Sequence, residues 1–383
     1  MHAKDAMSSP TSSHSSRNLC ASRVLLLFCS EPYHGGMSTY LVTGASGFFG
    51  GILKRRLLRE GHSVVNIDLQ RDEDTGLPEL TGIQGDLRDR ELVERTFAQH
   101  RFDAVFHCAA QLAHGSRLDE HLLWTSNVDA TVLLAEAARA HGVKPFVFIS
   151  TNCLWAADLG HPVREDDVPA PIEIYGRSKL EAEQRLQAFA TDLDVVMLRV
   201  PTIMDEGRLG LLAILYEFID DGKTVWVVGD GGNQYQFIYA DDLATACIQS
   251  AQYGKSGLFH LGSDDVKSMR AVYESVVRAS GSRSRVRSLP KAPTIAAMMA
   301  AHKLRISPLG PYHYKMISES FSFDTRRAKR ELGWQPTLTN EQMLLRAYRH
   351  YRDHRREIHG RSDVSAHRKP AGMGIIRLLK WLS

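Results

Sequence analysis

The sequence predicts an α/β protein built on a doubly wound parallel sheet, followed by a smaller C-terminal α/β region. Two observations support this fold class. From Met37 onward, short apolar runs alternate with segments of helical periodicity, which is the pattern of consecutive βαβ units. The apolar runs, such as AVFHC and FVFIS, are continuous. Strands that are buried on both faces of a sheet have this character.

The predicted elements follow one another in order along the first 200 residues. Strands are expected at Tyr40–Thr43, Ser63–Asp68, Gly82–Gln84, Ala104–Cys108, Pro145–Ser150 and Val195–Val200. Helices between them include Gly50–Glu60, Asp89–Gln99, Leu122–His141 and Tyr175–Ala190. After Pro201 the alternation loosens, with strands expected at TVWVVGD and LFHLG and a helix between them starting near Asp241.

Composition excludes several classes of protein. The 383 residues carry a net charge of +3, with 43% hydrophobic and 24% charged residues, as in an ordinary globular protein and unlike a nucleic-acid binder. No apolar run approaches the roughly 20 residues that span a bilayer. The cysteines are odd in number and form no CxxC pair, which argues against a disulfide framework or a zinc site and for a reducing compartment. They are Cys20, Cys29, Cys108, Cys153 and Cys247.

A glycine-rich turn follows the first predicted strand. In TGASGFFG, the glycines Gly44, Gly47 and Gly50 lie between a strand and a helix. Glycines there permit a tight turn, close approach of the backbone to a pyrophosphate, and a helix N-terminus that faces the phosphate charge. Asp68 ends the second strand near the spacing expected for a carboxylate that binds ribose. The turn therefore predicts dinucleotide binding, with Asp68 favouring NAD and the nearby Arg71 leaving NADP open.

Three residues form a candidate catalytic group. In YGRSK, Tyr175 and Lys179 are four residues apart and share one face of a helix. A phenol with a pKa of about 10 can act as an acid/base near pH 7 when a neighbouring ammonium lowers that pKa. Thr151 follows the strand that ends at Ser150, so its hydroxyl is expected at the carboxyl edge of the sheet. Thr151 would orient a substrate oxygen, Tyr175 would move its proton, and Lys179 would tune Tyr175.

The motifs together resemble the extended short-chain dehydrogenase/reductase family, which contains the NAD-dependent epimerases and dehydratases. The resemblance covers about residues 39–348. It rests on TGASGFFG, GDLRD, VFHCAA, SNVDAT, FIST, YGRSK, GDGGNQYQFIYADDLA and LGWQPT. It implies a Rossmann fold, an NAD(P)-dependent oxidoreductase or epimerase, and a homodimer.

The resemblance also assigns roles to individual residues. It implies that Lys179 binds the nicotinamide ribose, as part of its role beside Tyr175, and that Asn127 orders the active-site helices. The other residues implied to hold the cofactor are Gly44, Gly47, Phe48, Phe49, Gly50, Asp68, Asp86, Leu87, Ala109 and Ala110.

Departures from the family pattern narrow the expected reaction. Dehydratases of the family carry an acidic residue directly after the catalytic Thr, but here Asn152 and Cys153 follow Thr151. Sugar-nucleotide members hold the diphosphate with an Asn and an Arg at positions that align with Thr202 and Tyr235. The loss of that Arg weakens a nucleotide-sugar interpretation unless another arginine replaces it, with Arg208 and Arg270 as the candidates.

The C-terminal segment suggests a different kind of substrate. Arg346, Arg349, Arg352, Arg355 and Arg356 form a basic face with no obvious partner in the sequence. Residues 373–382 then combine apolar side chains with Arg377, Lys380 and Trp381, as do helices that lie in an anionic membrane surface. Docking of this segment on the protein itself or on a dimer partner is the alternative.

These observations divide the chain into four parts and leave three functions open. Residues 1–36 are a disordered tail or a misassigned start. Residues 37–200 form the NAD(P)-binding domain, which also receives 225–255. Residues 201–345 form the substrate-binding region, and 346–383 form a basic amphipathic tail. The favoured function is cytoplasmic, peripherally membrane-associated reduction of a hydrophobic ketone, such as a 3-oxo-sphingolipid or a sterol-like ketone. The alternatives are a nucleotide-sugar 4-epimerase or 4-ketoreductase, and a non-catalytic cofactor-binding scaffold.

Overall fold

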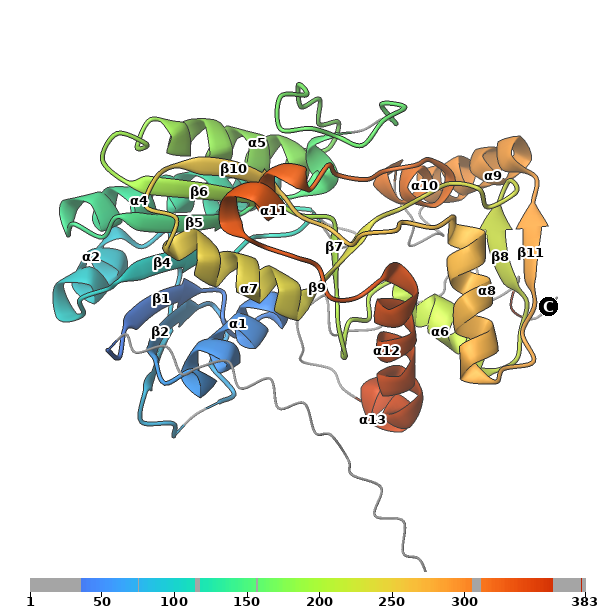
Figure 1. Ribbon diagram of the computed structural model, residues 1–383, viewed down its shortest axis with the longest axis horizontal. Helices are drawn as coiled ribbons and strands as arrows, with labels where there is room; N and C mark the ends of the chain where they lie inside the picture. Colours follow the sequence, from blue (N-terminus) through green and yellow to red (C-terminus); the bar gives the residue numbers. More distant parts are fainter. Residues whose placement is uncertain are drawn as a thin grey trace, which may run out of the picture. The chain divides into compact units, whose positions relative to one another are not determined.

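A seven-stranded parallel sheet carries the first half of the chain, in agreement with the predicted doubly wound fold (Figure 1). The computed structural model describes residues 36–74, 76–113, 118–155, 158–304, 311–360 and Lys380. The strand order is β10-β6-β5-β4-β1-β2-β3, so the order reverses between β1 and β4. The strands are β1 (Thr39–Thr43), β2 (Ser63–Asp68), β3 (Leu80–Gln84), β4 (Ala104–His107), β5 (Pro145–Ile149), β6 (Asp194–Arg199) and β10 (Gly257–His260).

Helices cover both faces of this sheet, which is why its strands are apolar on both sides. One core cluster joins the sheet to α1 (Phe48–Arg59) and α7 (Ala240–Ala251). The other joins it to α2 (Arg90–Gln99), α4 (Ala130–Ala140) and α5 (Ile174–Gln187). The first six strands lie within two residues of their predicted bounds.

The single helix predicted at Leu122–His141 is instead a composite. It consists of α3 (Glu120–Trp124), a π-helical segment η1 (Thr125–Asp129) and α4. Single π-helical turns inside α-helices are frequent at functional sites. The spacing of apolar residues did not reveal this π-helical segment, because only one of its five residues, Val128, is apolar.

The region after β6 forms a second layer of small elements around its own core (Figure 1). Two parallel strand pairs, β7 (Thr202–Met204) with β9 (Phe237–Tyr239) and β8 (Val225–Val228) with β11 (Val286–Leu289), lie here. The other helices of this region are α6 (Leu212–Asp220), α8 (Met269–Ser280), α9 (Lys291–Lys303), α10 (Pro311–Ser318), α11 (Arg326–Leu332), α12 (Asn340–Asp353) and α13 (Arg355–Gly360). The short helix η2 (Asn152–Leu154) comes earlier in the chain, between β5 and α5.

The segment that returns to the large sheet differs from the expected residues 225–255, because it begins at α7 and ends with β10 (Gly257–His260). Strand β8 pairs with β11 outside that sheet, whereas α7 packs on the sheet and β10 extends its edge. The sequence placed TVWVVGD in the correct secondary structure but in the wrong sheet, because a four-residue apolar strand does not identify its partner.

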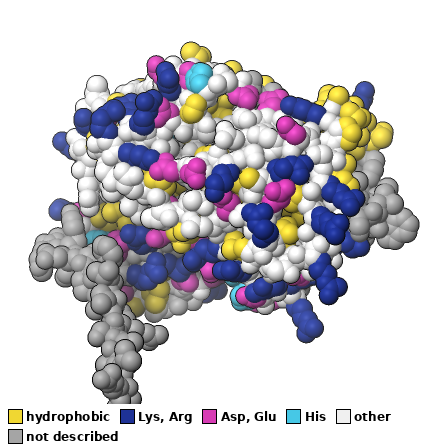
Figure 2. All heavy atoms as spheres, turned by 45° about the vertical axis from the view of Figure 1, so that its right-hand side comes forward, with side chains coloured by type: hydrophobic (Ala, Val, Ile, Leu, Met, Phe, Trp, Pro, Cys, Tyr) yellow, Lys and Arg dark blue, Asp and Glu magenta, His cyan; other side chains and the backbone are white. Residues whose placement is uncertain are grey.

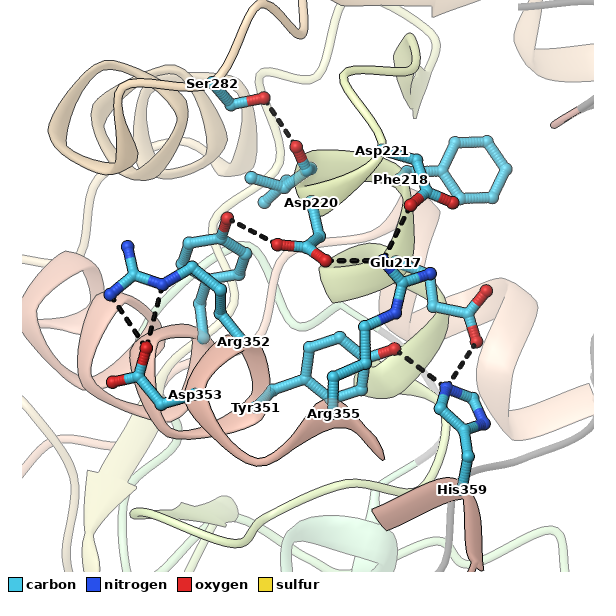
Figure 3. A network of polar contacts seen from close by, with 12 residues as sticks. Glu217, Phe218, Asp220, Asp221, Ser282, Tyr351, Arg352, Asp353, Arg355 and His359 are labelled. Carbon is cyan, nitrogen blue, oxygen red and sulfur yellow. Dashed lines mark hydrogen bonds and ion pairs between the residues drawn. The ribbon is translucent and has the colours of Figure 1, made fainter. Parts of the chain in front are cut away.

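Three of the five arginines of the basic face, Arg346, Arg352 and Arg355, have acidic partners, contrary to the sequence-based expectation. Arg346 Nε donates to the Asp205 carboxylate at 3.0 Å, and Arg346 Nη2 lies 3.1 Å from the Glu206 carboxylate. Arg355 bridges Asp220 and Asp221 at the end of α6, and the Arg352 guanidinium lies 2.9 Å from Asp353 (Figure 3). The partners of Arg346 and Arg355 lie more than a hundred residues earlier in the chain, so the local sequence did not reveal them.

Residues 361–379 and 381–383, which carry most of the proposed membrane segment, lie outside the described residues. Lys380 is described, and its ammonium lies 2.8 Å from Glu217 and 2.6 Å from Asp221. Both carboxylates belong to the end of α6 that also binds α13 (Figure 3). At this position the tail contacts the protein itself. Within the described part of the chain, no helix has both the length and the apolar character needed to cross a membrane.

Candidate active site

The glycine turn lies where the strand order reverses, and its geometry admits only glycine at two positions. Gly44 follows β1 with φ +72°, and a Cβ there would lie 2.7 Å from Ala109 Cα, just beyond β4. A Cβ on Gly50 would lie 2.3 Å from the Gly44 carbonyl oxygen. Such contacts force a displacement of backbone. In open α/β sheets the ligand crevice lies at this reversal, outside the carboxyl ends of the strands.

The glycine turn leads into the N-terminus of α1, and the composition of this helix end suits an anionic ligand. Gly47 is the N-cap and supplies no side-chain hydrogen bond, and the first turn carries no acidic residue. Phe48 and Phe49 are buried beneath it. A helix N-terminus that follows a glycine-rich turn and has no side-chain cap suits a pyrophosphate. The residues present therefore fit a dinucleotide.

Asp68 lies at the end of β2 and contacts the turn directly. One carboxylate oxygen accepts the Ser46 amide at 3.0 Å, and the other accepts the Gln70 amide at 2.9 Å. Burial raises the pKa of Asp68, and the two amide hydrogen bonds oppose that rise. The carboxylate is thus fixed beside the turn, at the place where the ribose of a bound dinucleotide is expected.

The other expected cofactor residues surround the same edge. Asp86 and Leu87 follow β3, where the Arg88 guanidinium holds the pKa of Asp86 below its usual range. Leu87 is buried. Ala109 is half-buried and Ala110 is exposed directly after β4.

Replacing Asp68 with Ser is expected to relax the choice between NAD and NADP. Removal of the carboxylate removes its repulsion of a 2′-phosphate, so the ratio of NAD to NADP affinity should fall about tenfold or more. Titration of both cofactors by fluorescence measures this ratio. Glu79→Ser removes an exposed carboxylate at the end of the β2–β3 loop, directly before β3, and should leave the ratio unchanged. A wild-type protein that prefers NADP would contradict the assignment of Asp68.

The structure brings Thr151, Tyr175 and Lys179 to the carboxyl end of β5. Thr151 follows β5 and is buried, and its hydroxyl is hydrogen-bonded to the Tyr175 phenol. Tyr175 lies in the first turn of α5. Lys179, one turn later, is 2% exposed, and its ammonium lies 3.8 Å from the centre of the Phe148 ring. The arrangement places a hydroxyl, a phenol and an amine at one edge of the sheet.

The electrostatics differ in one respect from the sequence-based expectation. Burial raises the pKa of Tyr175, as does Cys153, while the Thr151 hydrogen bond and Arg208 lower it. Burial lowers the pKa of Lys179 to about 7, against the opposing effects of Glu183 and Cys108. The expected lowering of the Tyr175 pKa by Lys179 is therefore not found here, and desolvation dominates for both groups.

One positioning residue, Gly176, was missed in the sequence, and a second, Asn127, was expected from the family resemblance alone. A Cβ on Gly176 would lie 2.3 Å from the Cys153 carbonyl oxygen, so this glycine lets α5 approach the segment that carries Thr151. The Asn127 side chain, in the π-helical segment, accepts the Gln111 amide at 2.7 Å and donates to the Ser178 hydroxyl at 3.0 Å. The resemblance had assigned Asn127 an ordering role, and these contacts join the loop after β4 to α5. The YGRSK motif contains both Gly176 and Ser178, but their roles depend on tertiary contacts.

His107 is a buried neutral group beneath the site. It ends β4 between the hydroxyls of Thr43 and Thr131, at 2.7 and 2.8 Å. Burial, together with the nearby Lys179, lowers its pKa from 6.5 to about 3. Below pH 6.5 the unfolded chain therefore binds a proton that the folded chain does not, and stability is lost as the pH falls toward 3.

The variant His107→Gln should reduce the dependence of the free energy of unfolding on pH. One such group contributes up to about 1.4 kcal/mol of unfolding free energy per pH unit between its two pKa values. Urea unfolding at several pH values from neutral to mildly acidic measures the slope. A variant with the wild-type slope would mean that His107 is protonated in the folded protein. The matched control is His121→Gln, which removes an exposed histidine instead of a buried one and should keep the slope.

Tyr235, Arg270 and Arg208, which the sequence raised in connection with diphosphate binding, have different surroundings in the structure. Tyr235 is buried, and its hydroxyl accepts from Asn152 at 2.8 Å, which commits it to the structure beside Thr151. Arg270 binds the Asp230 carbonyl and Ser288, on the α8–β11 side. The Arg208 guanidinium lies 5.8 Å from the centre of the Phe48 ring, and its charge lowers the pKa of Tyr175. Of the two candidate arginines, Arg208 lies nearer to the candidate site. Among the described residues, no cluster of His, Cys, Asp and Glu could hold a metal ion.

Comparisons with known proteins agree with this geometry. Residues 40–262 match the NAD dependent epimerase/dehydratase family. A Sinorhizobium fredii protein known as uncharacterized protein y4nG is 34% identical, over 90% of this chain and 86% of its own. A UDP-glucose 4-epimerase of Mycolicibacterium smegmatis is 27% identical, over 82% of this chain and 98% of its own. The crystal structure of a Thermotoga maritima UDP-glucose 4-epimerase with UDP-glucose has a TM-score of 0.67 and 24% identity, over 82% of this chain and 99% of that one.

Proposed function

Because the chain belongs to the NAD-dependent epimerase/dehydratase family, we propose that it is a nucleotide-sugar 4-epimerase with NAD as its cofactor. The observation that carries the proposal is the similarity to UDP-sugar 4-epimerases over nearly their whole length. The juxtaposition of Thr151, Tyr175 and Lys179 beside the glycine turn supports it. The acidic residue that a dehydratase needs after the catalytic Thr is replaced by Asn152, which binds Tyr235.

The chemistry follows from the residues at the sheet edge. Inversion at a secondary alcohol requires that the hydrogen on carbon be removed and returned to the opposite face. NAD, when bound, supplies the acceptor and donor for that hydrogen as hydride. Tyr175 takes the proton of the hydroxyl and returns it, while Thr151 holds the substrate oxygen by hydrogen bonding. The positive charge of an oxidised nicotinamide would favour the tyrosinate that burial disfavours.

Arg208 is the side chain that could replace the missing diphosphate arginine. Its guanidinium lies close to both the first turn of α1 and the catalytic phenol. A guanidinium can bind a diphosphate through two parallel hydrogen bonds. This position supports a nucleotide-sugar substrate in spite of the arginine that is missing at Tyr235.

The decisive experiment is interconversion of epimers. Purified protein with NAD is incubated with UDP-glucose or UDP-galactose, and separately with the UDP-xylose and UDP-arabinose pair, and products are identified by NMR. Appearance of the other epimer from both directions supports the proposal. Failure with every pair, together with oxidation of NADH by ceramide-like or sterol ketones, would contradict it and favour the ketone reductase that the sequence first suggested.

Three other expectations stay predictions. They are a homodimer, a cytoplasmic location, and contact between residues 361–383 and a membrane. The ion pairs of Lys380 with Glu217 and Asp221 favour, at that position, the alternative in which the tail docks on the protein.

A further inference from the structure

Helix α9 has an unusual surface for an exposed helix. From Ala292 to Ala301, the only polar side chain is that of Thr294. Ile295 and Met298 are half-buried and face the protein, but the outward positions are apolar as well. A surface helix normally carries polar residues on its outer face, and one that is apolar all round is normally buried.

The outward side of α9 is well exposed. Met299 is 56% exposed, and Leu304, which caps the helix, is 69% exposed. Ala292 and Ala296 lie exposed on the same helix. Figure 2 shows hydrophobic side chains gathered on this side of the molecule, with Lys and Arg side chains below them. A contiguous apolar patch of this kind, bordered by polar residues, marks an interaction site.

A row of arginines adjoins this helix. Arg283, Arg285 and Arg287 are exposed, whereas Ser284 is buried and Val286 half-buried between them. Alternate residues of an extended segment point the same way, so the three arginines lie on one side of β11 and the residues that lead into it. Strand β11 runs directly into α9 through Pro290 (Figure 1).

The charge of this region has one sign. Lys291 and Lys303 are exposed at the two ends of α9. The sequence contains no Asp or Glu between Glu274 and Glu319. By contrast, Arg346 and Arg355 of the C-terminal helices are neutralised by carboxylates. The β11–α9 surface therefore combines apolar area with a positive charge that its own segment does not balance.

We propose that β11 and α9 form a docking surface for an anionic phospholipid bilayer. The apolar side chains of α9 enter the interface between headgroups and acyl chains, and the arginines and terminal lysines contact lipid phosphates. Apolar insertion beside basic residues is how peripheral helices bind anionic membranes. A second copy of this chain fits less well, because an isologous contact would place the same arginines against one another.

The test is sedimentation of the full chain with vesicles. Binding is expected with phosphatidylcholine vesicles that contain phosphatidylglycerol, weaker binding with phosphatidylcholine alone, and a decrease at high salt. The double variant Arg285→Glu/Arg287→Glu and the single variant Met299→Asp should each weaken the partition coefficient about tenfold or more. Cofactor binding and the unfolding midpoint verify that the variants are folded.

The matched controls are exposed positions in the domain that contains the large sheet. Arg95→Glu/Arg101→Glu makes the same change of charge at exposed positions around α2, and Leu77→Asp changes an apolar side chain that is 45% exposed. Both should bind as the wild type does. The proposal is overturned if the wild type does not bind anionic vesicles. It is also overturned if the β11–α9 variants bind normally, which would assign binding to another segment such as 361–383. A change of oligomeric state in Met299→Asp with unchanged vesicle binding would instead assign this face to a second copy.

Discussion

Replacing Tyr175 with Phe is expected to lower turnover by about 10²–10⁴-fold, because it removes the only group placed to move the substrate proton in the proposed mechanism. The ring remains, and the glycine turn and Asp68 are untouched, so NAD binding should persist. The hydrogen bond between the phenol and Thr151 is lost as well. The effect should therefore appear mainly in kcat.

Steady-state kinetics of epimerisation and a separate NAD titration distinguish these effects. The matched control is Tyr253→Phe, which removes a phenol bound to Glu331 at the far end of α7 and should leave kcat unchanged. Retention of turnover within tenfold of the wild type would contradict the role assigned to Tyr175.

Replacing Arg199 with Met is expected to destabilise the fold by about 3–5 kcal/mol, since it leaves a buried carboxylate without its partner. Arg199 ends β6 and donates to Glu183 of α5 at 2.7 and 3.0 Å, with both side chains almost fully buried. Glu183 lies one turn beyond Lys179, so the pair also fixes the helix that carries the catalytic residues.

Urea unfolding of the protein measures this loss. The control is Arg185→Met, which breaks an exposed pair with Glu181 on the same helix and should cost only about 0–1 kcal/mol. A loss below about 1 kcal/mol for Arg199→Met would show that Glu183 finds another partner or becomes protonated without penalty.

The sequence predicted those parts of the site that depend on local pattern. The glycine turn, Asp68 and Thr151 each follow a strand whose apolar run is unambiguous, and parallel strands bring their carboxyl ends to one edge. Helical spacing places Tyr175 and Lys179 on one face, and the position of their helix after the fifth predicted strand makes the pair a catalytic candidate. These inferences required no knowledge of which distant residues meet.

The remaining features depend on contacts between residues that are far apart in the sequence. Gly176 matters because the Cys153 carbonyl lies against it, and Asn152 matters because it reaches Tyr235, which is 83 residues away. Arg346 and Arg355 bind carboxylates that are 141 and 135 residues away, so the local sequence does not show that these charges are balanced. The raised pKa of Tyr175 depends on burial, a property of the whole fold.

The position of β10 at the edge of the large sheet has a consequence for how the protein is made. This strand pairs with β6, although the substrate region begins between them. A nascent chain that has not yet reached Gly257 exposes the backbone groups of β6, and an unpaired apolar edge is a template for aggregation. Completion of the nucleotide-binding sheet must therefore wait for translation of part of the second region. Residues 37–200 expressed alone would leave the edge of β6 unpaired, so this fragment is expected to aggregate through strand pairing between molecules.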